Sequence, residues 1–117
     1  MNFKKASVEE LIQEYEQAAR DYERALKDAN SRRANRAHDR ILDAYRELRG
    51  RAATSRLLQL LGSDSDNVRG SVAVHALEFA PEQGEPVLIE LTSHPGLIAM
   101  RAHYALKAWR EGTLKFP

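Results

Sequence analysis

The apolar residues of this chain recur at steps of three and four, which is the spacing of one face of an α-helix. In residues 8–29 ten apolar residues follow this pattern without a break, and no proline occurs in the first 80 residues. Ser7 and Glu10 stand at the start of the pattern with the spacing of a capping box, in which both side chains satisfy free backbone N–H groups. The sequence therefore predicts a helical fold whose first helix covers about residues 8–29.

Five further helices are predicted between turns that contain glycine, proline, serine or aspartate. The second has Asn30 or Ser31 as its N-cap and Gly50 as its C-terminal stop. The others are placed at 52–61, from the turn at 63–66 to Pro81, at 85–92 with Pro86 in the first turn, and at 97–110. Tyr45, Tyr104 and Trp109 are expected in the core, and the tail 113–117 is expected to dock on the last helices.

Composition limits the class of protein. With 43% hydrophobic and 30% charged residues, the 117-residue chain is too apolar for a disordered protein and too polar for a membrane protein. No secretory signal segment is recognisable at the N-terminus. The absence of cysteine excludes a disulfide scaffold, a thiolate zinc site and a cysteine nucleophile. We expect one soluble, cytoplasmic domain that comprises residues 1–117.

The net charge of +1 conceals an arginine-rich middle. Residues 30–58 hold eight arginines and three acidic residues, whereas residues 1–29 and 59–117 each hold five basic and seven acidic residues. Two interpretations follow. The segment could bind an anion such as nucleic acid, or it could pair with carboxylates of the chain itself, for example Arg36 with Asp39 and Arg40 with Asp43.

An internal repeat with an offset of 32 residues aligns Arg69 with Arg101 and the alanine-rich segments that follow them. A period of this size with two helices per unit is typical of helical-hairpin solenoids. The predicted fold class is all-α, a short right-handed α-α superhelix of about three helical hairpins.

Residues 57–77, with Leu57-Leu58-x-Leu60-Leu61 before the turn and Val68-Arg69 after it, resemble a HEAT repeat. The resemblance implies that Asp66 and Arg69 are the structural residues that tie successive units together. In the next unit Arg101 is kept, but His94-Pro95-Gly96 stands where the turn aspartate is expected.

The whole chain, up to the ending Glu111-Gly112-x-x-Lys115-x-Pro117, resembles a small bacterial family, a domain of unknown function with a HEAT-like or armadillo-like fold. The resemblance implies a fold and little about activity. Some relatives of such single-domain proteins are suspected partners or immunity proteins in bacterial toxin systems.

Reactive chemistry has little support in the sequence. The four histidines lack metal-ligand spacing and are expected to be solvated. No nucleophile elbow, phosphate-binding loop or dinucleotide fingerprint occurs. We expect no enzymatic activity, no catalytic residue, no metal and no cofactor.

The leading hypothesis is a protein-interaction module that binds another protein through the second helix of each hairpin. The candidate surface residues are Arg32, Arg36, Asp39, Asp43, Ser71, His75, Glu78, His103, Lys107 and Arg110. The alternative is binding of a nucleic-acid backbone by the Arg-rich segment 32–56. No membrane partner is expected, and the oligomeric state stays open.

Overall fold

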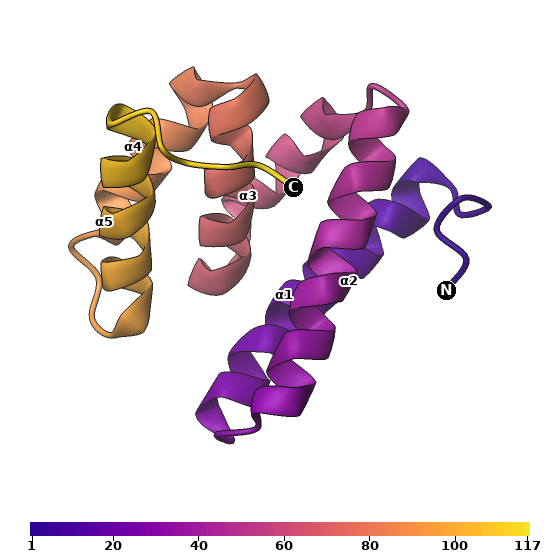
Figure 1. The fold of residues 1–117 in the computed structure, drawn as a ribbon, viewed down its shortest axis with the longest axis horizontal. Helices are drawn as coiled ribbons and strands as arrows, with labels where there is room; N and C mark the ends of the chain where they lie inside the picture. Colours follow the sequence, from indigo (N-terminus) through magenta and orange to yellow (C-terminus); the bar gives the residue numbers. More distant parts are fainter. The chain divides into compact units, whose positions relative to one another are not determined.

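The computed structural model describes residues 1–117, and all of its regular structure is helical (Figure 1). Five α-helices and one 3₁₀ helix are present and no strand. In chain order they are α1 (Val8–Lys27), α2 (Ser31–Gly50), η1 (Thr54–Gly62), α3 (Asp66–Phe79), α4 (Pro81–Leu91) and α5 (Leu97–Arg110). The predicted all-α class is confirmed.

The helices form two compact units, residues 1–57 and residues 58–116. The chain passes from one unit to the other within η1, which is a 3₁₀ helix and not the α-helix expected at 52–61. In a 3₁₀ helix, residues three apart share one face. Leu57 and Leu60 have this spacing, and both are buried.

In residues 1–57, α1 and α2 pack side by side as a helical hairpin (Figure 1). The predicted capping box begins α1: the Glu10 backbone N–H donates to Ser7 Oγ (3.1 Å), and the Ser7 N–H donates to Glu10 Oε1 (2.8 Å). The N-cap of α2 is Asn30, whose Oδ1 accepts from the Arg33 N–H (3.0 Å). Buried side chains of both helices include Leu11, Ile12, Tyr15, Ala18, Ala19, Ala37, Ile41, Ala44, Tyr45 and Leu48.

Alanine, not glycine, takes the left-handed position after α1 and α2. The φ angles of Ala29 and Ala52 are 52° and 54°, and Gly112 has the same role after α5 with 74°. In each case the next residue donates its N–H five residues back, as in a Schellman motif: Asn30 to Ala25 O, Ala53 to Leu48 O and Thr113 to Ala108 O. The prediction that Gly50 stops the second helix is therefore wrong, because α2 includes Gly50 and reverses two residues later.

In residues 58–116, α3, α4 and α5 surround a separate core. Its buried members are Ala73, Leu77, Leu88, Leu91, Ala102 and Leu106. Trp109, Leu114 and Phe116 pack against it while partly buried, so the tail docks as predicted. The helix expected at 85–92 begins four residues earlier, because Pro81 lies at the first helical position and needs no N–H there.

Gly84 lets α4 approach α3 closely. A Cβ added at this position would lie 2.5 Å from the carbonyl oxygen of Ala73 and 3.1 Å from the Cβ of Ala76. No other residue type fits there without moving one of the two helices. None of the helices in the structure combines the length and the apolar character needed to cross a membrane.

Candidate functional site

Four residues of the predicted surface lie on α2. Arg32, Arg36, Asp39 and Asp43 are all exposed, on the side of the helix that its buried residues leave open. Asp43 Oδ1 lies 3.7 Å from Arg46 Nη1, which is a weak, solvent-exposed ion pair.

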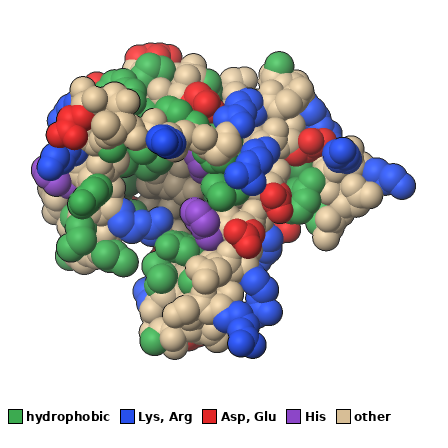
Figure 2. Space-filling view, viewed as in Figure 1, with side chains coloured by type: hydrophobic (Ala, Val, Ile, Leu, Met, Phe, Trp, Pro, Cys, Tyr) green, Lys and Arg blue, Asp and Glu red, His purple; other side chains and the backbone are tan.

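The Arg-rich segment is largely compensated by the chain's own carboxylates. Five of its eight arginines pair with a carboxylate side chain: Arg33 with Asp28, Arg40 with Glu14 and Asp21, Arg46 with Asp43, Arg51 with Glu47, and Arg56 with Glu9. A sixth, Arg49, donates to the C-terminal oxygen of Pro117. Arg32 and Arg36 form no ion pair and lie near the start of α2. Figure 2 shows Lys and Arg side chains gathered at that end of the α1–α2 hairpin, at the lower right.

The sequence suggested that Arg40 pairs with Asp43 of its own helix. In the structure Arg40 instead pairs with carboxylates of α1. Its Nη2 and Nε donate to the two carboxylate oxygens of Glu14 (2.8 and 3.3 Å), and its Nη1 donates to Asp21 Oδ2 (2.8 Å). Burial acts to raise the pKa of the Asp21 carboxyl, but the hydrogen bonds from Arg40 and Gln17 outweigh it and leave that pKa below its ordinary value. The pKa of Arg40 is raised, chiefly by its hydrogen bonds to Glu14.

The candidate residues on α3 are less accessible than predicted. Glu78 is exposed and Ser71 is half-buried, but only 8% of the surface of His75 is accessible. The expectation that His75 is a solvated surface residue is therefore wrong. The physical reason is that α3 has buried residues around most of its circumference, so its spacing pattern leaves no wide polar side.

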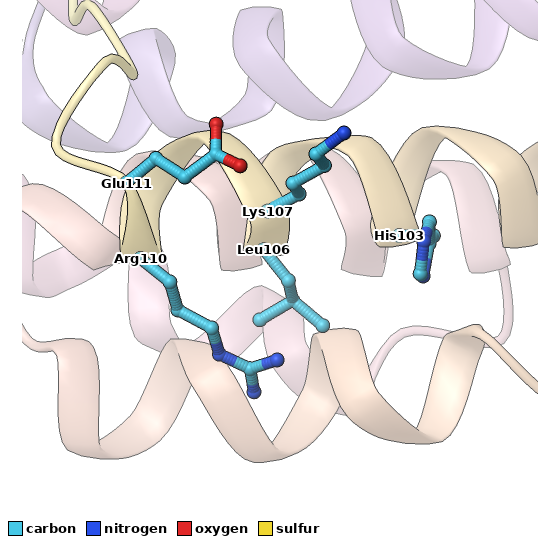
Figure 3. Close-up of a pocket in the computed structure, with 5 residues that line it drawn as sticks. All are labelled: His103, Leu106, Lys107, Arg110 and Glu111. Carbon is cyan, nitrogen blue, oxygen red and sulfur yellow. The ribbon is translucent and has the colours of Figure 1, made fainter.

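The candidate residues on α5 are exposed and line one shallow hollow. His103, Lys107 and Arg110 form its wall together with Leu106 and Glu111, and its volume is about 290 Å³ (Figure 3). Figure 3 shows Leu106 and Arg110 pointing to one side of α5, and Lys107 and Glu111 to the other. Arg110 Nη2 donates to Glu85 Oε2 of α4 (3.2 Å).

A polar cluster connects the start of α3 with the turn before α5. Asp66 accepts a hydrogen bond from Arg69 Nη1 (3.3 Å), and its other oxygen lies 2.6 Å from His94 Nδ1. Arg69 also donates to the carbonyl oxygen of Leu61 (3.1 Å) and pairs with Glu90.

Sequence reasoning singled out Asp66 and Arg69 but missed His94, the partner of Asp66, which was expected to be solvated. The substitution of a histidine at the turn-aspartate position was the available signal. A histidine can bond to the aspartate of the preceding turn, whereas a second aspartate there would repel it.

The side of α5 that faces away from the core carries large apolar side chains. The exposed fractions are 53% for Leu97, 63% for Met100 and 71% for Tyr104. The prediction that Tyr104 lies in the core is therefore wrong, while Tyr45 is fully buried and Trp109 partly buried. We call Leu97, Met100 and Tyr104 the outer face of α5.

In residues 1–117 no group of three or more His, Asp or Glu side chains is arranged to hold a metal ion. The structure thus defines an all-helical protein with ion-paired helices and an exposed apolar face.

No family model matches the chain, and no curated protein matches it. Among solved structures, the chain is similar to the crystal structure of the protein RPA1889 from Rhodopseudomonas palustris CGA009, with a TM-score of 0.93 and 22% sequence identity. The match covers 100% of this chain and 99% of the other. A likeness at this level of identity shows that the two chains share the helical fold.

Proposed function

We propose that this protein is a non-enzymatic protein-interaction module built from HEAT- or armadillo-like helical hairpins. The observation that carries the proposal is the outer face of α5, where three large apolar side chains are each more than half exposed. Exposed apolar side chains that lie together on one face mark interaction surfaces, whereas single exposed apolar residues are normal and need no explanation.

The contacts in residues 58–116 support the HEAT-like assignment. Asp66 at the start of α3 bonds to Arg69 of its own helix and lies against His94 in the turn before α5. These are the positions at which the HEAT resemblance expects residues that tie neighbouring units together. An adaptor or a toxin-immunity protein, the roles that the bacterial resemblance suggests, would each need a surface of this kind.

The alternative, binding of a nucleic-acid backbone through residues 32–56, has weaker support. A phosphate has to displace the existing partner of a paired arginine, and five of the eight pair with carboxylate side chains while Arg49 donates to Pro117 O. The unpaired Arg32 and Arg36 offer two contacts, fewer than a tight nonspecific site uses.

Affinity capture with surface variants tests the proposal. The tagged full chain is compared with Met100→Gln/Tyr104→Gln on α5, with Arg36→Glu/Asp43→Lys on α2, and with Leu26→Gln as a matched control at an exposed apolar residue on α1. We expect one protein to be recovered in near-equal amount with the wild type and the control, and to be lost with one surface variant. The recovered protein, once purified, must bind the wild-type chain directly.

Recovery of no stoichiometric protein contradicts the proposal, and so does equal recovery with all four chains. Circular dichroism of each variant serves as the folding control. The substituted side chains are exposed, so we expect no loss of helix content.

A further inference from the structure

The outer face of α5 has the geometry of a helix-packing surface. Leu97, Met100 and Tyr104 are separated by three and four residues, so they lie on one side of the helix over two turns, about 10 Å in length. The opposite side of α5 is occupied, because Ala102 and Leu106 belong to the core of residues 58–116. α5 is therefore apolar on two sides, and within residues 58–116 the outer face is left exposed.

The internal repeat gives this face a counterpart. The 32-residue offset places Met100 over Val68 and Tyr104 over Val72. Both valines are completely buried, whereas Met100 and Tyr104 are 63% and 71% exposed. The same face of the repeated helix is thus a packing surface in the first copy and open in the second.

The charges around the outer face are predominantly basic. Arg101, whose Nη1 also donates to Asn67 Oδ1 of α3 (3.1 Å), borders it on one side, and Lys107 and His103 border it on the other. All three are exposed. The acidic residue at this end of the helix, Glu111, lies two turns beyond Tyr104. A partner with carboxylates on both sides of its apolar surface complements this pattern, and a basic partner does not.

A second copy of this chain fits the face poorly. Two outer faces packed against each other would bring Arg101 and Lys107 of both copies close together. The acidic helix α1 of a second copy has no apolar side to offer, because Leu11, Tyr15 and Ala18 are completely buried in its own hairpin.

We propose that the outer face of α5 binds an amphipathic α-helix of another protein, an inference that rests on the proposed function as an interaction module. The apolar side of that helix is bordered by aspartate or glutamate. Leu97, Met100 and Tyr104 contact the apolar side of that helix. Arg101 and Lys107 select the acidic borders.

A displayed library of peptide helices tests this inference. The peptides have leucines at helical spacing on one side, and their flanking positions vary among Glu, Gln and Lys. Selection on the full wild-type chain is expected to enrich Glu. Binding of a selected peptide should weaken at least about tenfold with Met100→Gln/Tyr104→Gln and should stay unchanged with Leu26→Gln. Selection on Lys107→Glu should shift the enriched residue away from Glu.

Three results would overturn the inference: no enriched peptide, enrichment without preference for Glu, or equal binding to Met100→Gln/Tyr104→Gln. A wild-type dimer in sedimentation that disappears with the same variant would also overturn it, because a second copy would then be the occupant. If affinity capture recovers a partner that only the α2 variant loses, the interaction module stands and this inference falls. If affinity capture recovers no partner at all, the proposed function itself fails.

Discussion

Arg40 links the two helices of residues 1–57 by bonding to two carboxylates of α1. Both carboxylates are at least partly buried, with side-chain exposures of 16% for Glu14 and 32% for Asp21. The sequence predicted a partner three residues away, because spacing within one helix is all that a sequence displays. A partner on the neighbouring helix depends on how the two helices are rotated about their axes. The apolar pattern does not define this rotation closely enough to identify the partner side chain.

Replacing Arg40 with methionine should lower the free energy of unfolding by about 1–2 kcal/mol. The substitution leaves Glu14 and Asp21 beside each other without their cation, while methionine keeps most of the apolar stem. Urea denaturation at neutral pH measures the change. Arg36→Met is the matched control, because Arg36 is exposed and has no ion pair, and it should change stability by less than about 0.5 kcal/mol. Equal effects of the two substitutions would contradict the assigned role.

The lowered pKa of Asp21 predicts a loss of stability in acid. A carboxyl whose pKa is lower in the folded state than in the unfolded state stabilises the fold above the ordinary aspartate pKa of about 4. That stabilisation disappears as the pH falls through the folded-state pKa. In Arg40→Met we expect a smaller loss between neutral pH and acid than in the wild type. Denaturation curves at several pH values over this range measure the loss. An equal dependence of the unfolding free energy on pH in Arg40→Met and the wild type would contradict the prediction.

Ala52 should be improved by glycine. A left-handed φ places the Cβ of an L-residue too close to the backbone, at a cost of about 1–2 kcal/mol. Part of the gain is cancelled by the greater freedom of glycine in the unfolded chain. We expect Ala52→Gly to raise the thermal midpoint by an amount that corresponds to about 0.5–1 kcal/mol. Gly112 also has a left-handed φ, so the reverse substitution Gly112→Ala should lower the thermal midpoint. A shift of the midpoint in the same direction for both variants would contradict the argument.

At the scale of helices, the apolar periodicity located the long elements well. α1, α2 and α5 begin at the predicted residues, because a capping side chain or a glycine precedes each of them. The shorter elements were predicted less well. Pro81 and Pro86 both fit a first helical turn, so the sequence alone left two possible starts; in the structure α4 begins at Pro81 and continues through Pro86.

The close crossing of α3 and α4 predicts opposite effects for two glycine substitutions. Gly84→Ala should destabilise the fold by about 1–3 kcal/mol, because its Cβ would overlap the backbone oxygen of Ala73, which cannot move without its helix. Gly50→Ala meets open space and has no positive φ, so stability should stay the same or rise by up to about 1 kcal/mol. Thermal unfolding of both variants measures the difference, and a neutral Gly84→Ala would show that the helices can separate at little cost.

Over the whole molecule, the sequence pattern predicted the exposure of the candidate residues on α2 and α5 but not of those on α3. The four residues on α2 and the three on α5 are exposed as expected, whereas His75 is buried. Tyr104 shows the complementary error. Apolar spacing identifies a side of a helix that can be covered, but it does not tell whether the same chain covers it.

The distribution of ion pairs predicts weak binding to nucleic acid. In a gel-shift experiment with mixed DNA and RNA at two salt concentrations, we expect no shift near physiological ionic strength and at most a faint one at low salt. Each neutralised phosphate contributes through released counterions, and most arginines of the segment are already compensated. A strong shift that weakens steeply with salt and disappears with Arg32→Ala/Arg36→Ala would favour the alternative function.

The two alanines in left-handed turns leave this fold room for improvement that does not involve its binding face. Ala29 and Ala52 lie after α1 and α2, in residues 1–57, whereas the outer face lies in residues 58–116. Glycine at both positions would add folding stability, and this added stability would allow the fold to tolerate destabilising substitutions elsewhere. A laboratory programme that retargets α5 to new helices could start from that doubly substituted background.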